Sequence, residues 1–177
     1  MLKTDNAVLV VVDVQGKLAR MVDRSDYVIG NVAKAVRGAR ALGIPIVVTE
    51  QYPDGLGPTV AEIADALESF RPITKRTFSC CGVDAFIERL GRRRQVLIAG
   101  IETHVCVYQT AMDLLATGYE VHVLTDAVSS RDPENAAFAI QRMIDEGAKV
   151  SSVEMALFEL LHIARGDVFK EILAIVK

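Results

Sequence analysis

The sequence has 177 residues, of which 51% are hydrophobic and 24% are charged, a composition that fits one domain (residues 1–177) with a sizeable core. Its formal net charge of −3 argues against a nucleic-acid-binding protein. The longest apolar run, "AVLVVVDV", has the length of a strand, which argues against a membrane-spanning segment.

The N-terminal residues and the cysteines both indicate in which cellular compartment the protein is expected. "MLKTDNAVLV" lacks the apolar core and the small-residue cleavage site of a signal peptide. The 3 cysteines are odd in number and lack Cys-x-x-Cys spacing, which argues against a disulfide framework and against a zinc ribbon. We therefore expect reduced thiols and a cytoplasmic protein.

Short apolar runs alternate with helical patterns along the whole chain. The expected strands are residues 7–14, 44–50, 72–76 (the weakest), 95–100, 120–127 and 149–155. The expected helices are residues 25–43, 59–70, 83–93, 103–118 and 132–147, followed by two short amphipathic segments within 155–177. Several of the expected helices end at glycine, and "DPEN" supplies an N-cap aspartate with proline behind it.

The expected strands are apolar at consecutive positions, a pattern typical of strands that are buried on both faces. Together with the alternation of strands and helices, this pattern predicts an α/β fold with a mostly parallel, Rossmann-like sheet covered by helices on both sides. Right-handed crossovers then bring the carboxyl ends of the strands to one edge of the sheet, where α/β proteins build their sites.

Three side chains with chemical potential fall at that edge. Asp13 ends the first strand, Lys75 lies in the third, and Cys106 follows the fourth in "AGIETHVC". Each type also has a structural explanation, since an aspartate often caps a turn, an edge lysine is often solvated, and a free cysteine often packs in a core. Their convergence from separate strands favours a shared chemical role.

The position of Cys106 suits a nucleophile. A cysteine attacks as the thiolate, and an ordinary pKa of about 8.5 leaves little thiolate at neutral pH. If Thr103 is an N-cap, Cys106 falls near the third helical position, where free N–H groups and the helix dipole favour an anion. A nearby lysine would favour the anion further, and an aspartate could transfer the proton to a leaving amine. With N–H groups for an oxyanion, these parts suit hydrolysis at a carbonyl carbon.

Four stretches of the chain carry a family resemblance: "VVVDVQ", "TEQYPDGLG", "ITKRTFSC" and "LIAGIETHVCVYQTAMDLLATGYEVHVLTDAVSSR". With them the chain resembles the isochorismatase-like cysteine hydrolases over nearly its whole length, and the last stretch contains the family's Gly-x-x-Thr-x-x-Cys signature. The resemblance implies that Asp13 transfers protons, that Lys75 is its electrostatic partner and that Cys106 is the nucleophile.

The resemblance also implies structural features. A cis peptide bond is expected between Ile101 and Glu102, where it would turn backbone N–H groups toward the substrate oxyanion. A six-stranded parallel sheet in a three-layer α/β/α sandwich is expected, as is a homo-oligomer, either a dimer or a larger assembly.

Departures from the family pattern narrow the activity. Nicotinamidases carry an Asp-x-His pair after strand two and a further histidine, which together hold a metal, whereas no histidine precedes His104 in this chain. We therefore expect no metal and no cofactor, which argues against a nicotinamidase. True isochorismatases cleave a vinyl ether and lack the nucleophilic cysteine, so Cys106 favours hydrolysis of a C–N bond in a small amide-like substrate.

Residues adjacent to the three central side chains are candidates for substrate binding: Gln15, Gln51, Tyr52, Phe78 and His104. The two glutamines either orient the substrate or bind loop backbone, and the sequence leaves both roles open. The loop 52–58 is a candidate lid. Cys80 and Cys81 are interpreted as packing residues, with a redox pair as the alternative.

Two other functions remain as alternatives to amide hydrolysis. One is hydrolysis of an isochorismate-like ether, with Asp13 as general acid. The other is a non-catalytic protein that binds a ligand or assembles with partners. A nucleotide-binding domain is disfavoured because no Gly-x-Gly-x-x-Gly follows the first strand.

Overall fold

The computed structural model describes all 177 residues and contains one six-stranded sheet with the order β3-β2-β1-β4-β5-β6. Every neighbouring pair of strands is parallel. The strands are β1 (Ala7–Val12), β2 (Ile46–Gln51), β3 (Ile73–Lys75), β4 (Gln95–Ile101), β5 (Glu120–Ser129) and β6 (Lys149–Ser151). The order reverses beside β1, so the carboxyl ends of β1, β2 and β4 face the crevice in which open α/β sheets bind ligands.

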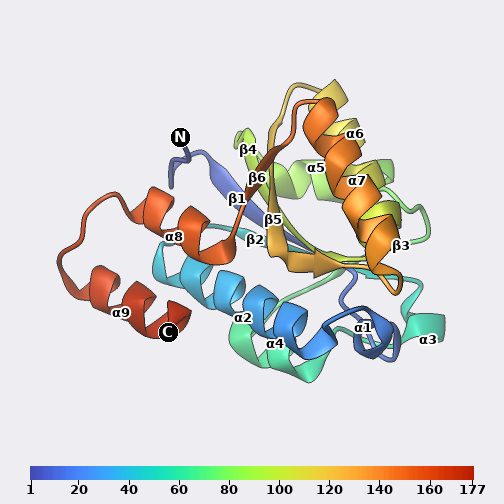
Figure 1. Cartoon of the computed structure of the whole chain (residues 1–177), viewed down its shortest axis with the longest axis horizontal. Helices are drawn as coiled ribbons and strands as arrows, with labels where there is room; N and C mark the ends of the chain where they lie inside the picture. The colour runs from blue at the N-terminus through green and yellow to red at the C-terminus, as the bar shows by residue number, and fades with distance from the viewer.

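Helices cover both faces of this sheet (Figure 1). They are α1 (Leu18–Met21), α2 (Ser25–Ala41), α3 (Pro53–Leu56), α4 (Ala61–Leu67), α5 (Asp84–Leu90), α6 (Tyr108–Ala116), α7 (Pro133–Asp145), α8 (Val153–Leu161) and α9 (Asp167–Val176), with the short turns η1 (Cys80–Gly82) and η2 (Thr103–Val107). In Figure 1, α2, α4, α8 and α9 lie on one side of the sheet and α5, α6 and α7 on the other. The predicted three-layer α/β/α sandwich is confirmed.

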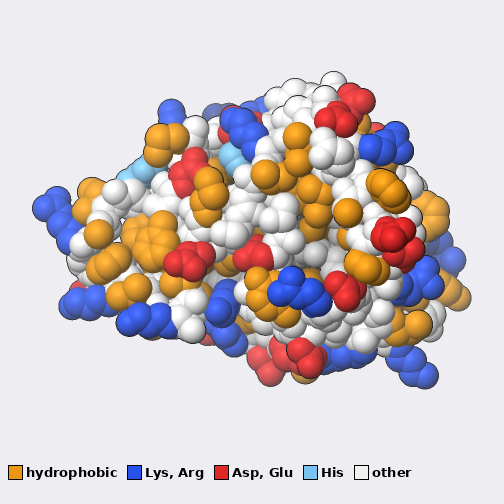
Figure 2. Space-filling model, in the orientation of Figure 1, with side chains coloured by type: hydrophobic (Ala, Val, Ile, Leu, Met, Phe, Trp, Pro, Cys, Tyr) orange, Lys and Arg blue, Asp and Glu red, His pale blue; other side chains and the backbone are white.

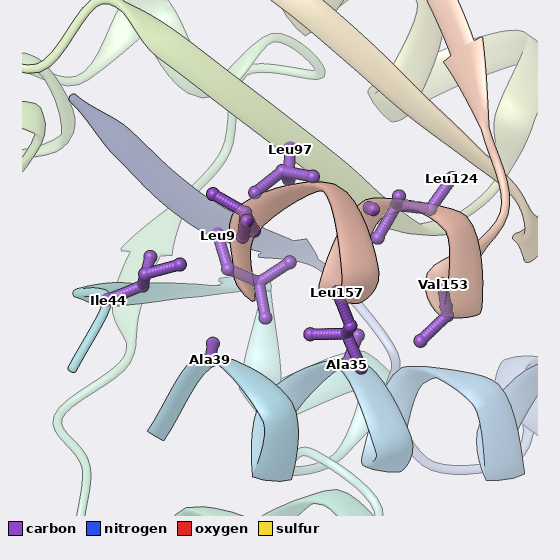
Figure 3. A pocket seen from close by; sticks show the side chains of 10 residues that line it. Leu9, Ala35, Ala39, Ile44, Leu97, Leu124, Val153 and Leu157 are labelled. Atoms are coloured by element: carbon purple, nitrogen blue, oxygen red, sulfur yellow. The ribbon is translucent and has the colours of Figure 1, made fainter. Parts of the chain in front are cut away.

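Two apolar cores sit on the two faces of the sheet. All six residues of β1 are buried, and alternate ones enter opposite cores, Leu9 and Val11 on one side and Val8 and Val10 on the other. This division explains why β1 reads as a continuous apolar run instead of an alternating one. A gap of about 10 Å³ between the sheet, α2 and α8 is lined by hydrophobic residues alone (Figure 3), so it is a packing gap and too small for a substrate.

The structure differs from the sequence-based expectations mainly at element ends. The strand expected at 149–155 stops at Ser151, because the hydroxyl of Ser152 accepts a hydrogen bond from the N–H of Met155 and so begins α8. The helix expected from residue 103 begins instead with a π-helical turn, η2, and becomes α-helical only at Tyr108. Such turns are uncommon and frequently occur at functional sites.

Gly100 sets the spacing between β4 and the end of β1. Its φ is +125°, and a Cβ at this position would lie 2.1 Å from the carbonyl oxygen of Val12. Only glycine allows β4 to lie this close to the end of β1, which is followed directly by Asp13. The approach places the segment that leads to Cys106 beside the segment that carries the carboxylate.

We expect the substitution Gly100→Ala to destabilise the fold by about 3 kcal/mol or more, because strain at positive φ adds to a clash with backbone atoms. Equilibrium urea unfolding measures the loss. Gly30→Ala is the matched control, since Gly30 lies within α2 and a Cβ there meets nothing within 4 Å. That variant should gain about 0.5–1 kcal/mol. Equal stability of the two variants would contradict the role given to Gly100.

Candidate active site

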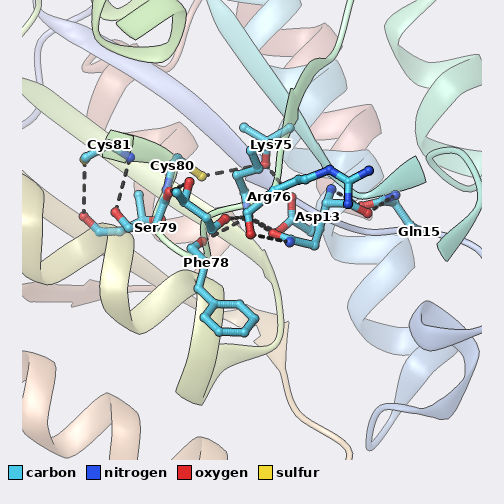
Figure 4. A network of polar contacts seen from close by, with 12 residues as sticks. Asp13, Gln15, Lys75, Arg76, Phe78, Ser79, Cys80 and Cys81 are labelled. Atoms are coloured by element: carbon cyan, nitrogen blue, oxygen red, sulfur yellow. Dashed lines mark hydrogen bonds and ion pairs between the residues drawn. The ribbon is translucent and has the colours of Figure 1, made fainter. Parts of the chain in front are cut away.

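A buried ion pair joins β1 to β3 at the carboxyl edge of the sheet (Figure 4). Lys75 Nζ lies 2.6 Å from Asp13 Oδ2, and both residues are only 2% exposed. Since β2 lies between β1 and β3, Lys75 reaches across the end of β2 to make the contact. Two of the three residues chosen from the sequence are therefore in direct contact.

Neighbouring groups complete the hydrogen bonding of this pair. Lys75 Nζ also donates to Gln51 Oε1 at 2.8 Å, to the Phe78 carbonyl at 2.9 Å and to the Thr77 carbonyl at 3.2 Å. The hydroxyl of Thr49 donates to Asp13 Oδ1 at 2.7 Å. Both oxygens of Asp13 therefore accept hydrogen bonds, as a carboxylate does, and the side chain is held from β2 and β3.

The backbone at Asp13 is also unusual. Its φ is +52°, in the left-handed region that a residue other than glycine rarely adopts. Such conformations cost free energy and occur preferentially at functional sites. The turn at the end of β1 thus presents the carboxylate to Lys75 and to the segment after β4.

Cys106 lies in η2, directly after β4, and is 7% exposed. Burial raises the pKa of its thiol to about 12, the negative charge of Asp13 and a side-chain contact with Asp13 act in the same direction, and Lys75 opposes them. The structure therefore brings the third chosen residue to the ion pair. The expectation of a stabilised thiolate is wrong, because burial disfavours the charged sulfur and the Asp13 carboxylate repels it, and together they outweigh the attraction of Lys75.

Thr103 does not act as the expected N-cap. Glu102 precedes the η2 turn, and its carbonyl accepts hydrogen bonds from the N–H groups of Val105 and Val107. The hydroxyl of Thr103 is fully buried without a hydrogen-bond partner. Cys106 consequently lies inside a π-helical turn and not at the third position of a capped α-helix.

The peptide bond between Ile101 and Glu102 is cis. The Glu102 carboxylate accepts hydrogen bonds from the backbone N–H of Arg131 at 3.1 Å and from Arg131 Nε at 3.0 Å. Burial works against the charged form of this carboxyl, but the contacts with Arg131 outweigh it and lower the pKa of Glu102. Arg131 thereby holds the segment between β4 and η2 against the end of β5.

Gln15 and Gln51 both take structural partners. Gln15 is fully buried, and its Nε2 donates to the carbonyls of Gln51 at 3.1 Å and Gly57 at 2.7 Å, while its Oε1 accepts from the N–H of Gln51 at 2.6 Å. Gln51 orients Lys75 through Oε1 and donates from Nε2 to the carbonyl of Arg76 at 3.0 Å. Gln15 therefore binds only backbone groups, whereas Gln51 binds the Lys75 side chain as well as backbone.

The segment 52–58, expected as a loop and candidate lid, contains the short helix α3 and is held in place at its C-terminal end. Glu50 Oε1 accepts hydrogen bonds from the N–H and the hydroxyl of Thr59 at 2.8 and 2.7 Å. The N–H of Gly16 donates to the carbonyl of Pro58 at 3.1 Å. With Gln15 bound to Gly57, these contacts hold the loop beside the turn that carries Asp13.

The remaining candidates lie around the network. Tyr52 and Phe78 are exposed to 43% and 53%, respectively. The backbone N–H of Tyr52 donates to the carbonyl of Lys75, and the carbonyl of Phe78 accepts from Lys75 Nζ. His104 Nδ1 lies 2.8 Å from Ser130 Oγ, and its side chain lines a hollow with Tyr108 and with residues of α7. This hollow is lined by none of Asp13, Lys75 and Cys106. No cluster of three or more His, Cys, Asp or Glu side chains has an arrangement that could hold a metal ion.

Sequence reasoning missed Thr49 and did not anticipate a role for Cys80 at this site. The thiol of Cys80 lies 3.7 Å from the hydroxyl of Thr49. The backbone N–H of Cys80 donates a hydrogen bond to the hydroxyl of Thr110. Burial raises the pKa of Cys80 and of Cys81 to about 11 each, and all three cysteines are free. The signal for Thr49 was its position at the carboxyl end of a buried strand, directly beside the strand that ends at Asp13.

The chain is thus an α/β/α sandwich with a parallel six-stranded sheet and a buried carboxylate–ammonium pair at the carboxyl edge of that sheet. The isochorismatase domain model matches residues 7–155. The chain is 40% identical over 180 residues to the secreted isochorismatase effector Isc1 of Phytophthora sojae, covering 97% of this chain and 85% of that protein. It belongs to the isochorismatase family and is an isochorismatase-family hydrolase.

Two solved structures share the fold over almost the whole chain. The MAR1 ribonuclease from Caenorhabditis elegans is 37% identical, with a TM-score of 0.94 over 99% of this chain and 91% of that one. YcaC from Pseudomonas aeruginosa, solved with hexane-2,5-diol and covalent acrylamide, is 27% identical, with a TM-score of 0.92 over 99% and 89%.

We expect Lys75→Met to lower the free energy of unfolding by about 3–5 kcal/mol, because it leaves the buried Asp13 carboxylate without its counter-ion. Urea unfolding measures the loss. Adding Asp13→Asn should recover part of it, since a neutral amide needs no cation. Lys17→Met, at an exposed position outside any ion pair, should change stability by less than about 0.5 kcal/mol. A loss below 1 kcal/mol for Lys75→Met would contradict the account.

The raised pKa of Cys106 predicts how its thiol reacts with iodoacetamide. Because the thiolate is the reacting form, the rate should rise about tenfold per pH unit from pH 7 to pH 10 without levelling off. Peptide mass spectrometry after timed labelling gives the rate at each cysteine separately. A plateau near neutral pH at Cys106 would show a stabilised thiolate and contradict this result.

Proposed function

We propose that the chain is a cysteine hydrolase that cleaves the C–N bond of a small amide-like molecule through an acyl-enzyme on Cys106. The observation that carries the proposal is the position of the Asp13 carboxylate. It is fixed by Lys75 at 2.6 Å and by Thr49 at 2.7 Å, and its charge and its side-chain contact help to raise the pKa of the Cys106 thiol. A base that is oriented by other groups and lies beside a nucleophile is the arrangement that covalent catalysis requires.

The first half of the reaction forms the acyl-enzyme. Asp13 accepts the proton of the Cys106 thiol while the sulfur attacks the carbonyl carbon of the amide, which gives a tetrahedral oxyanion. The oxyanion collapses, the C–N bond breaks, and Asp13 returns the proton to the leaving amine. A thioester on Cys106 and a free amine result.

The second half releases the acid. Asp13 accepts a proton from water while the water oxygen attacks the thioester carbon, and the C–S bond then breaks. The sulfur takes the proton back from Asp13, which restores the thiol and the carboxylate. Lys75 keeps Asp13 oriented throughout and balances its charge.

The protonated thiol fits this sequence of steps. A thiol with a pKa near 12 needs a base at the moment of attack, and the base is present at Asp13. Acrylamide is an electrophile to which cysteine sulfur adds, so the covalent acrylamide in the YcaC structure supports a reactive nucleophile in that relative. We further propose, from the family resemblance, that backbone N–H groups around Ile101 and Glu102 stabilise the oxyanion.

Several accompanying expectations remain proposals. The substrate is a small molecule, metal and cofactor are not required, and the protein is cytoplasmic and homo-oligomeric.

One relative is named a secreted effector and one a ribonuclease, so secretion and RNA cleavage are the competing possibilities. Against RNA stand the net charge of −3 and the mixture of acidic and basic side chains over the face in Figure 2. No helix has the combination of length and apolar character that crossing a bilayer requires.

Ether hydrolysis with Asp13 as general acid is the second candidate, and a non-catalytic ligand-binding or assembly protein is the third. An acid must hold a proton, whereas both oxygens of Asp13 accept hydrogen bonds from Lys75 and Thr49. This arrangement favours Asp13 as a base over Asp13 as an acid, so amide hydrolysis is the first candidate function.

We expect Cys106→Ala to abolish amide hydrolysis, with a loss of at least about 1,000-fold in kcat, while the circular dichroism spectrum and urea midpoint stay close to those of the parent. The assay is ammonia release from a panel of small amides and carbamoyl compounds. Cleavage of an RNA oligonucleotide is followed separately by gel electrophoresis. Intact-protein mass spectrometry should detect the acyl adduct only when Cys106 is present.

Cys81→Ala is the matched control. Cys81 is free, is half-buried in η1 and makes no hydrogen bond to Asp13 or Lys75, so its loss should leave turnover within about twofold. Hydrolysis that survives Cys106→Ala would contradict the covalent mechanism. Turnover of a vinyl ether that survives alkylation of Cys106 would establish the second candidate.

A further inference from the structure

A hollow of about 380 Å³ lies beside the amino-terminal half of β2, and none of the three central residues of the candidate active site lines it. β3 pairs only with residues 49–51 of β2, so residues 46–48 have no neighbouring strand on that edge of the sheet. The end of α2, the segment between α4 and β3, and α5 surround this open stretch instead. The volume falls within the range of about 300–1,000 Å³ that is typical of small-molecule sites.

One part of the hollow is apolar. Five hydrophobic side chains line it: Ile44, Ile46, Val48, Leu67 and Phe70. Ile44, Val48 and Leu67 are buried, whereas Ile46 and Phe70 remain partly exposed to solvent. Because removing such surface from water is favourable, this floor suits the hydrocarbon part of a small molecule.

The other part of the hollow is formed by three arginines, Arg40, Arg71 and Arg89. Arg40 already has partners, since its Nη2 lies 2.6 Å from Glu68 Oε2 and its Nη1 donates to the carbonyl of Ala66 at 2.9 Å. Arg71 and Arg89 are exposed, and neither has a carboxylate within 4 Å. Two guanidinium groups are therefore left without a counter-ion.

A hydrogen bond joins these two arginines. Arg89 Nη1 donates to the carbonyl of Arg71 at 3.3 Å, which holds the end of α5 against the segment that leads into β3. Glu68 is the one carboxylate paired with an arginine of the hollow, so the three arginines exceed it by two positive charges. A guanidinium matches the two oxygens of a carboxylate, and such charge-assisted hydrogen bonds are among the stronger ones in proteins.

The two parts of the hollow together restrict its ligand. An inorganic anion would contact the arginines and leave the floor in water, and a neutral hydrocarbon would cover the floor and leave the two charges without a partner. A molecule that carries an acid group on an apolar body uses both parts.

We propose that this hollow is a second binding site, which takes a small organic acid. Arg71 and Arg89 bind its carboxylate, and the apolar floor between β2 and α4 covers its hydrocarbon body. The site lies outside the candidate active site, so the proposal goes beyond the hydrolysis proposed above and does not depend on it.

The test measures binding of octanoate by calorimetry and compares it with acetate and 1-octanol, which keep the carboxylate alone or the hydrocarbon chain without the charge. We expect octanoate to bind about tenfold or more tightly than either of them. No detectable binding of octanoate, or the same affinity for octanoate and acetate, would overturn the proposal.

Variants assign the carboxylate to the arginines. Arg71→Met and Arg89→Met should each weaken octanoate binding by about fivefold or more and leave 1-octanol binding unchanged, while Arg89→Lys should retain part of the affinity. Arg92→Met is the matched control, because Arg92 is exposed, forms no ion pair and does not line the hollow. Parent-like affinity in both Arg71→Met and Arg89→Met, or an equal loss in Arg92→Met, would overturn the proposal.

Methyl NMR of the parent protein locates the ligand without any substitution. Octanoate should shift the methyl signals of Ile46, Val48 and Leu67, which line the hollow. The signals of Val14 and Val107, which follow Asp13 and Cys106 directly in the chain, should not move. Shifts centred on Val14 and Val107 would place octanoate in the candidate active site and refute the second site.

Discussion

The buried ion pair between Asp13 and Lys75 is the constraint on which the site depends. Moving two charges from water into a protein interior costs several kcal/mol per ion, and attraction within the pair offsets this only when the remaining donors and acceptors are also satisfied. Here they are satisfied from three elements, since Thr49 and Gln51 come from β2 and the two carbonyls come from the segment after β3. The pair therefore fixes the relative positions of β1, β2 and β3 at their carboxyl ends.

The same pair determines how the thiol can react. Were Lys75 free, its charge would stabilise a thiolate at Cys106, as it does at cysteines with a lowered pKa. Because the ammonium is bound to Asp13, the thiol faces a neutralised cation and the nearer influence of a carboxylate, in a largely dry environment. Burial raises the pKa of this thiol to about 12 and the charge of Asp13 adds to the rise, so in the proposed mechanism the sulfur passes its proton to Asp13 as it attacks.

Much of the fold could be predicted from the sequence because it depends on patterns that are local. Consecutive apolar residues indicated the long buried strands, whereas β3 and β6 are short and partly exposed. The alternation with helical patterns indicated the parallel sheet, which in turn placed Asp13, Lys75 and Cys106 at one edge. The prediction that the last strand extends to residue 155 was wrong, because the Ser152 side chain caps α8 and so ends the strand at Ser151. The π-helical turn was missed because nothing in "THVC" distinguishes it from an ordinary helix start.

The details of the site were harder because they depend on which side chain takes which partner. The sequence suggests that a lysine near a cysteine lowers the thiol pKa. Only the coordinates show how deeply the thiol is buried and that Asp13 forms an ion pair with the lysine. The structural role of Gln15 and Gln51 has the same origin, since their partners are backbone groups of a loop that the sequence could not place.

The hydrogen-bond network around Asp13 and Lys75 is complete, and this limits which groups can recognise a substrate. Apart from the hydroxyl of Thr103, no buried side-chain nitrogen or oxygen lacks a hydrogen-bond partner. A substrate that took a donor from Lys75 or Gln51 would have to break an existing bond and leave its former partner buried and unsatisfied, which costs about 1–3 kcal/mol. The interior groups are thus suited to moving a proton and holding one another in place. Discrimination between substrates therefore falls to side chains outside the network that are still free to form hydrogen bonds.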